Sequence, residues 1–146
     1  MTIRFFTALL VLCLFSYCGP TYEQVPAAEV DQTEAAKAKA LGLKILNACE
    51  SGNYPILSTA EATLIMVDGL TADKQQTACT YLKEEYGAFQ DLSLGEVLRS
   101  VGDAGFRIYR YKGVFVDTEA VAEVRITLNK EGKMSGIWTM PWQAGL

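Results

Sequence analysis

The spacing of hydrophobic residues changes once along this chain, near Gly87, and this change restricts the possible folds more than any other feature. Before Gly87, apolar residues recur every three or four positions, which is typical of amphipathic helices. After Gly87, apolar and polar residues alternate, which is typical of half-buried strands. Helices followed by consecutive strands predict an α+β domain, here three N-terminal helices packed on a four-stranded antiparallel meander sheet.

The first and third helices have clear ends in the sequence. The first is expected from Thr33, capped by Asp31 or Thr33, and is expected to end at Gly52. The third is expected from Thr71 to Gly87. Glycine suits both C-terminal positions because it adopts the left-handed conformation without steric cost.

A second helix is predicted between these two. Ser58 followed three residues later by Glu61 has the spacing of a capping box, which starts a helix. Its buried face is expected to consist of Leu64, Ile65 and Val67.

Four strands are expected at residues 89–101, 106–116, 122–128 and 134–141. The last two are joined by Lys130-Glu131-Gly132, which has the pattern of a three-residue hairpin. If Asn129 pairs with Lys133, then Val124 faces Trp138 on the apolar side that packs against the helices. Three residues are then expected on the opposite, outer face of the sheet: Arg125, Ile137 and Thr139.

Charged residues interrupt both faces of the strand at 106–116. One face carries Arg110 and Lys112, and the other carries Arg107 beside Tyr109 and Tyr111. Either a bulge near Gly113 exchanges the two faces, or a charged side chain points inward. A buried arginine requires a carboxylate partner or an anionic ligand, and the sequence leaves both alternatives open.

The N-terminus has the pattern of an export signal. A basic Met1–Arg4 precedes the apolar segment Phe5–Phe15, which at about 17 Å of helix is too short to cross a bilayer. We expect a signal peptide at residues 1–18, a flexible tether at 19–32 and one domain at 33–146. The segment before Cys18 resembles a bacterial lipoprotein box, which implies lipidation of Cys18; ordinary cleavage after Cys18 or Ala27 is the alternative. The expected location is the bacterial cell envelope, in the periplasm or on the outer surface, with a lipid anchor in the membrane.

The composition excludes several classes of chemistry. The 146 residues include no histidine, which removes Ser-His, Cys-His and His-metal mechanisms. The net charge of −4 argues against nucleic acid as a partner. No CxxC pair, glycine-rich phosphate loop or metal-ligand cluster is present, so no metal and no cofactor are expected.

Cys49 and Cys79 are the two cysteines of the expected domain, on the first and third helices. An exported protein meets an oxidising compartment, where the pair can form a disulfide. The alternative is two separate buried thiols.

Several segments together resemble a family of uncharacterised exported domains with the cone-shaped fold of nuclear transport factor two and ketosteroid isomerase. They are Glu50–Tyr54, Tyr86–Phe89, Tyr109–Phe115, Val124–Leu128 and Gly132–Trp138. The resemblance implies a curved sheet wrapped around the helices, with a pocket at the wide end of the cone. It implies no activity, since this fold carries enzymes and binding proteins alike.

Seven residues are candidates for the lining of that pocket: Tyr81, Tyr86, Arg107, Tyr109, Arg110, Tyr111 and Trp138. We expect non-catalytic binding of a small apolar or anionic ligand or of a protein, including a homodimer formed through the sheet. The alternative is an isomerase- or dehydratase-type enzyme with Asp91 or Glu85 as its base. An enzyme requires an enclosed cavity with a desolvated carboxylate, whereas a binding module requires a filled cone and an apolar patch on the sheet.

Overall fold

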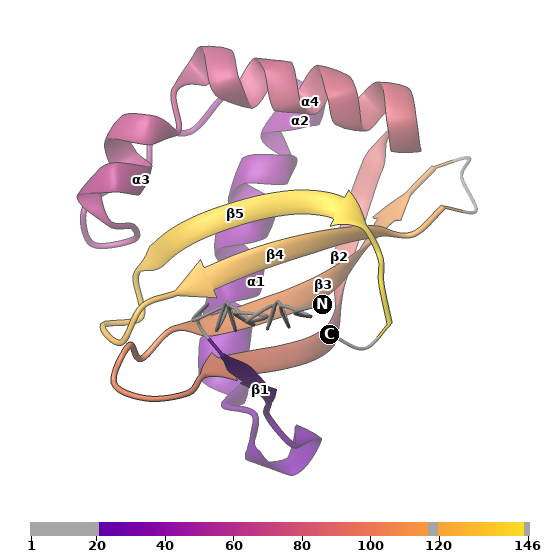
Figure 1. Ribbon diagram of the computed structural model, residues 1–146. Helices are drawn as coiled ribbons and strands as arrows, with labels where there is room; N and C mark the ends of the chain where they lie inside the picture. Colours follow the sequence, from indigo (N-terminus) through magenta and orange to yellow (C-terminus); the bar gives the residue numbers. More distant parts are fainter. Residues whose placement is uncertain (1–20, 117–119, 145–146) are drawn as a thin grey trace, which may run out of the picture.

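One antiparallel sheet and a layer of helices make up the fold in the computed structural model, which describes residues 21–116 and 120–144 (Figure 1). The elements are β1 (Tyr22–Gln24), the short 3-10 helix η1 (Ala27–Glu29), α1 (Gln32–Leu46), α2 (Ala48–Ser51), α3 (Leu64–Gly69), α4 (Ala72–Tyr86), β2 (Phe89–Ser100), β3 (Arg107–Phe115), β4 (Ala122–Leu128) and β5 (Met134–Pro141). The strands lie in the sheet in chain order, β1-β2-β3-β4-β5, each antiparallel to the next. The predicted α+β class is confirmed.

The sheet has five strands and not four, because β1 adds a strand at the edge of β2. Tyr22 pairs with Ser100, and the Val25 amide donates to the Val97 carbonyl at 2.8 Å. These residues fall within the tether that we expected at 19–32, so that part of the prediction is wrong. All three residues of β1 are exposed, so no alternation of apolar residues announces the strand; it forms because the edge of β2 offers unpaired backbone groups.

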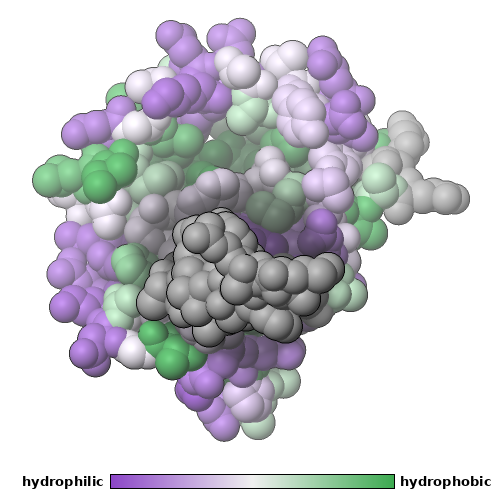
Figure 2. Space-filling model, in the orientation of Figure 1, coloured by the Kyte–Doolittle hydropathy of each residue, from purple (hydrophilic) through white to green (hydrophobic). Residues whose placement is uncertain are grey.

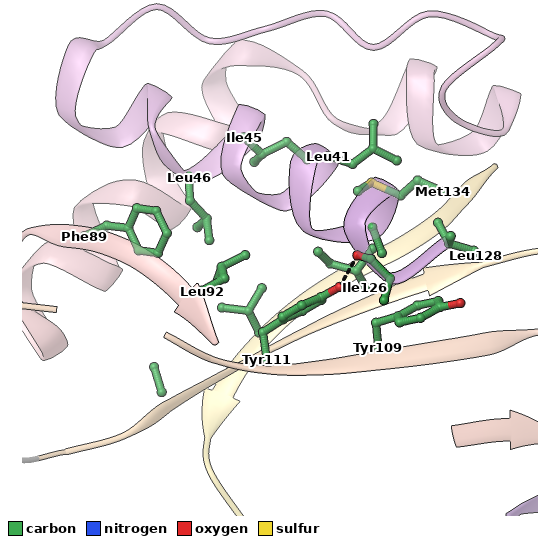
Figure 3. Close-up of a cluster of buried hydrophobic side chains, with 14 of the residues drawn as sticks. Leu41, Ile45, Leu46, Phe89, Leu92, Tyr109, Tyr111, Ile126, Leu128 and Met134 are labelled. Atoms are coloured by element: carbon green, nitrogen blue, oxygen red, sulfur yellow. Dashed lines mark hydrogen bonds between the residues drawn. The ribbon is translucent and has the colours of Figure 1, made fainter. Parts of the chain in front are cut away.

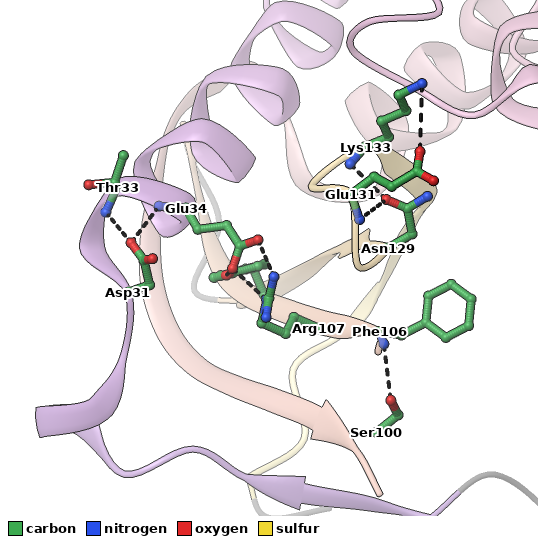
Figure 4. Close-up of polar contacts among 10 residues, drawn as sticks. Asp31, Thr33, Glu34, Ser100, Phe106, Arg107, Asn129, Glu131 and Lys133 are labelled. Atoms are coloured by element: carbon green, nitrogen blue, oxygen red, sulfur yellow. Dashed lines mark hydrogen bonds and ion pairs between the residues drawn. The ribbon is translucent and has the colours of Figure 1, made fainter. Parts of the chain in front are cut away.

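The first helix begins where predicted, but it is divided in two: α1 ends at Leu46, and the short α2 then runs to Ser51, just before the predicted end at Gly52. The Asp31 carboxylate accepts hydrogen bonds from the backbone amides of Thr33 and Glu34, at 2.9 and 3.0 Å, and so caps α1 (Figure 4). The apolar stripe of α1 packs on the sheet, with Leu41 and Ile45 buried. Gly52 ends the following short helix α2 with a φ of 72°.

The second predicted helix is displaced. Glu61 does accept from the Ser58 amide (2.8 Å) and hydroxyl (2.9 Å), but the backbone then bridges to β5, where the Thr63 amide donates to the Met134 carbonyl at 2.9 Å. The helix starts only afterwards, at Leu64. The hydrogen bond from Lys44, followed by those from Ser58, lowers the pKa of Glu61 to about 2.

The buried face predicted for that helix is also wrong. Leu64 is 66% exposed and Ile65 is 84% exposed, and no residue of α3 is buried. Val67 is half-buried and packs against the core. Since α3 is only six residues long and starts one turn later than expected, its apolar side chains point largely to solvent.

The third helix, α4, begins after its N-cap Thr71 and ends at Gly87, which has a φ of 83°. Its buried residues are Gln75, Cys79, Leu82 and Tyr86. A disulfide joins Cys79 to Cys49 on α2, with the two Cα atoms 5.0 Å apart, so the structure contains the bridge that was one of our two alternatives.

The last hairpin has the predicted turn but not the predicted register. The Asn129 amide donates to the Lys133 carbonyl at 2.9 Å, and Leu128 pairs with Met134 as expected. An irregularity between Thr127 and Leu128 then shifts the pairing by one residue, so that Arg125 and not Val124 lies opposite Trp138.

The shift moves the side chains of β5 to the other face. Trp138, predicted to face the helices, is 52% exposed on the outer face. Ile137, predicted on the outer face, pairs with Ile126 and packs against the core. Thr139, also predicted outside, lines a small crevice with residues of α1 and α4. One extra residue is enough to exchange the two faces of β5, because successive side chains of a strand point to opposite sides of the sheet.

The space between α1 and the sheet is filled by the hydrophobic core (Figure 3). Leu41, Ile45 and Leu46 of α1 lie toward Leu92 and Ile126 of the sheet. Within the same layer, the Tyr111 hydroxyl donates to the Ala35 carbonyl at 2.7 Å. Side chains therefore occupy the interior in which the resemblance placed a pocket.

Candidate functional site

A large hollow among the described residues lies on the outer face of the sheet, which is the face turned away from α1. It is an open groove of about 660 Å³, within the range of about 300–1,000 Å³ that is typical of small-molecule sites. Its lining comes from four of the strands and from residues near α3: Tyr22, Thr63, Ile65, Phe106, Ile108, Arg125, Thr127, Asn129, Ser135, Trp138 and Met140.

Large apolar side chains supply most of the groove wall. Phe106 directly precedes β3 and Ile108 lies near its start, and Trp138 and Met140 come from β5. At one rim, Ile65 is largely exposed, and Figure 2 shows hydrophobic side chains gathered at α3. An apolar hollow of this kind on a sheet face is typical of a binding surface.

Gly136 allows the indole of Trp138 to lie against the sheet. A Cβ atom at position 136 would lie 2.1 Å from the Trp138 ring, closer than any non-bonded contact permits. The indole therefore occupies the space over Gly136 and forms one wall of the groove.

Beside the groove, a buried ion cluster occupies the same face of the sheet. Arg110 is fully buried, and its Nε and Nη2 atoms donate to the two carboxylate oxygens of Glu123, both at 2.7 Å. Arg110 also donates to Glu96 and to the Gln143 carbonyl. A second arginine, Arg125, donates to Glu123 through its Nε.

These contacts determine the charge of the cluster. Burial alone would raise the pKa of Glu123, but the hydrogen bonds from Arg110 and Arg125 outweigh it and hold that pKa below its usual value. The hydrogen bond to Glu123 raises the pKa of Arg110 in turn. Glu123 and Arg110 therefore stay charged near neutral pH.

Trp142 covers this cluster. Its ring lies 4.6 Å from Arg110 Cζ and 4.9 Å from Lys112 Nζ, so it stacks on both cations. The ring approaches the sheet over Gly95, where a Cβ atom would lie 2.4 Å from it.

The ambiguity of the strand at 106–116 is now resolved. Tyr109, Tyr111 and Phe115 of β3 are buried on the helix side, and the bulges are in β2, not near Gly113. A charged side chain, Arg110, is buried instead, on the outer face, and its side-chain partners are the carboxylates of Glu123 and Glu96. On the helix side, Arg107 pairs with Glu34 (Figure 4).

The seven predicted pocket residues do not come together. Trp138 lines the groove, whereas Tyr86 packs in the core with its ring 5.4 Å from that of Phe115, and Tyr81 is exposed on α4. The other four belong to features described above. Arg107 and Arg110 form ion pairs, and Tyr109 and Tyr111 lie in the core. Burial and the neighbouring Glu34 raise the pKa of Tyr109, whose hydroxyl donates to Glu34 at 2.6 Å, and burial raises that of Tyr111.

The candidate bases also lie outside the groove. Asp91 is exposed and pairs with Lys39 at 3.0 Å, and Glu85 is exposed on α4. Sequence reasoning missed Phe106 and Ile108 as lining residues, although their alternation with Arg107 signals a shared face. Arg125 was placed on the outer face, as observed, but without a role in a pocket.

No protein-family model matches this chain, and comparisons with curated proteins and with solved structures give no significant match either. The resemblance to the cone-shaped domains therefore stays a prediction. Cys18 and the rest of the expected signal lie outside the described residues. Within residues 21–116 and 120–144, no helix is long and apolar enough to span a bilayer, and no three acidic or cysteine side chains gather where they could hold a metal ion.

Proposed function

We propose that this protein is a non-catalytic binding domain that holds a small, largely apolar ligand in the outer-face groove. The observation that carries the proposal is the groove itself, an apolar hollow of about 660 Å³ walled by Trp138, Phe106 and Ile108. Burial of these side chains against a ligand would remove apolar surface from water, which favours association.

The neighbouring carboxylate favours binding over catalysis. Glu123 is fully buried beside the groove, as an enzyme would require, but two arginines hold its oxygens and lower its pKa. A carboxylate whose charge is balanced by two arginines and whose pKa is lowered is a poor proton acceptor. The isomerase or dehydratase alternative therefore has less support.

We further propose that the domain is exported and tethered to the cell envelope through Cys18. The basic and apolar segments of residues 1–18 support this location. The disulfide between Cys49 and Cys79 supports it too, since disulfides persist in oxidising compartments.

The test is the binding of the uncharged fluorescent probe N-phenyl-1-naphthylamine. Trp138→Ala removes a groove wall and should weaken probe binding, whereas Tyr81→Ala should not. The pair is matched, because both aromatic side chains are 52% exposed and only Trp138 lines the groove. Equal binding to both variants and the wild type would contradict the proposal, and so would a stable dimer that buries the groove and excludes the probe.

A further inference from the structure

We infer that the ligand of the groove is a single-chain amphiphile with a carboxylate headgroup, and that this headgroup pairs with Arg125. The inference rests on the proposed function and adds the chemical class of the ligand. It is argued from the charge in the groove lining, the hydrogen bonds of Arg125, and the order of polar and apolar residues along the groove.

Arg125 is the only charged residue among the described residues that line the groove. The remaining lining consists of apolar side chains and neutral polar ones such as Thr127 and Ser135. Arg125 is paired with Glu123, but no carboxylate lines the groove itself, so a ligand with one negative charge is favoured there, because the low local dielectric strengthens its attraction to the guanidinium.

The guanidinium of Arg125 is held in place by Glu123, but only some of its N–H donors take part in this contact. Its Nε donates to Glu123, while its Nη1 and Nη2 atoms have no hydrogen-bond partner within the part of the chain that the structure describes. The side chain is 20% exposed and lines the groove, so a ligand in the groove can reach the guanidinium. A carboxylate matches this arrangement because it can accept the remaining N–H donors.

The Glu123 carboxylate does not cancel this preference. Its two oxygens already accept three hydrogen bonds from two guanidinium groups, two of them from Arg110. Glu96, the other acidic residue of the cluster, contacts Arg110. Glu123 therefore positions Arg125 and shares its own charge with a second cation.

The groove continues from Arg125 along β4 toward Asn129, and on the other side of Arg125 its lining includes Met140, which pairs with Glu123. Arg125 and Trp138 are cross-strand partners, and Ile108 pairs with Thr127 two residues further along β4. Asn129 lies another two residues on, so the groove floor spans about 13 Å of strand. Phe106 and Ile65 line the groove together with this part. Arg125 thus lies toward one end of a groove whose wall includes Phe106, Ile108 and Ile65, which fits a headgroup followed by an alkyl tail.

The experiment compares dodecanoate with dodecanol as competitors of N-phenyl-1-naphthylamine. The two ligands share an alkyl chain and differ in the charge of the headgroup. Wild-type protein should bind dodecanoate about tenfold or more tightly than dodecanol, the size expected for a charge-assisted hydrogen bond in an apolar wall. Arg125→Gln should reduce this ratio to near one.

Two further variants serve as controls. Lys112→Gln removes the same charge from the same face of the sheet but outside the groove lining, and it should keep the preference for dodecanoate. Arg125→Lys keeps the cation and should retain part of the preference, which covers the case in which Arg125→Gln folds poorly.

The outcomes separate the inference from the proposed function. Equal affinity of the wild type for both ligands, or a preference that survives in a folded Arg125→Gln variant, would overturn the inference while the groove remains a binding site. Failure of both ligands to displace the probe, or of the probe to bind, would overturn both.

Discussion

At the scale of single residues, the least expected feature is a fully buried arginine on the face of the sheet away from the helices. Arg110 is accommodated because Glu123 accepts two of its hydrogen bonds, the Gln143 carbonyl accepts another, and Trp142 covers its guanidinium. A buried charge is tolerated only when it is paired in this way. The cluster also holds Arg125 at the groove.

Removal of one charged partner from this cluster should lower the free energy of unfolding. Arg110→Met leaves Glu123 buried without its main partner and should lower the free energy of unfolding by about 3–5 kcal/mol. The double variant Arg110→Met/Glu123→Leu removes the unpaired charge and should recover much of that loss. Urea unfolding of both variants measures the difference.

The control is the exposed pair between Lys39 and Asp91. Lys39→Met should cost less than about 1 kcal/mol, because exposed ion pairs contribute little. An Arg110→Met variant as stable as Lys39→Met would show that the cluster does not hold the sheet in the way described.

At the scale of elements, glycines and bulges determine where each helix and strand begins and which way it faces. Gly87 joins α4 to β2 with a positive φ of 83° and lies against the backbone of Val116, directly after β3. The irregularity in β4–β5 sends Trp138 to the outer face and Ile137 to the core. The helix at α3 starts late because residues 62–63 pair with β5.

Gly87→Ala tests the junction between α4 and β2. Gly87 and Gly52 both have positive φ, 83° and 72°, but a Cβ at position 87 would lie 2.3 Å from the Val116 carbonyl oxygen, whereas one at position 52 meets nothing within 4 Å. Gly52→Ala should therefore cost about 1 kcal/mol from backbone strain alone. Gly87→Ala should cost distinctly more in thermal or urea unfolding, and equal losses would contradict the close approach.

At the scale of the whole molecule, the two faces of the sheet have different roles. The helix side is filled by the core, and the outer side carries the groove and the ion cluster. The disulfide between α2 and α4 ties together two parts of the helical layer that are 30 residues apart in sequence.

Loss of the disulfide should destabilise the fold without changing its topology. Cys49→Ala/Cys79→Ala opens a loop of 30 residues, and the expected loss is about 3–4 kcal/mol in the chain-entropy description. Wild-type protein treated with a reductant should lose a similar amount, and the reductant should leave the double variant unaffected. A wild type whose melting temperature does not respond to the reductant would contradict this expectation.

The candidate site was much harder to predict than the elements. Alternation along Ala122–Leu128 and Met134–Pro141 predicted the bounds of β4 and β5 as observed, and Asp31, Gly52 and Gly87 marked helix ends. The seven predicted pocket residues assumed that the space inside the helices and sheet was open. Leu41, Ile45 and their neighbours fill it, and packing between segments far apart in sequence has no local signature.

Local periodicity and end signals were thus sufficient for the fold class and for most helix and strand positions, because each depends on interactions within a few residues. The faces of β5, the burial of Arg110 and the groove depended on contacts between distant segments: a bulge in one hairpin, a carboxylate on the neighbouring strand, and a tryptophan near the C-terminal end of the chain. These could be read only in three dimensions, since one inserted residue reverses every later side chain in a strand.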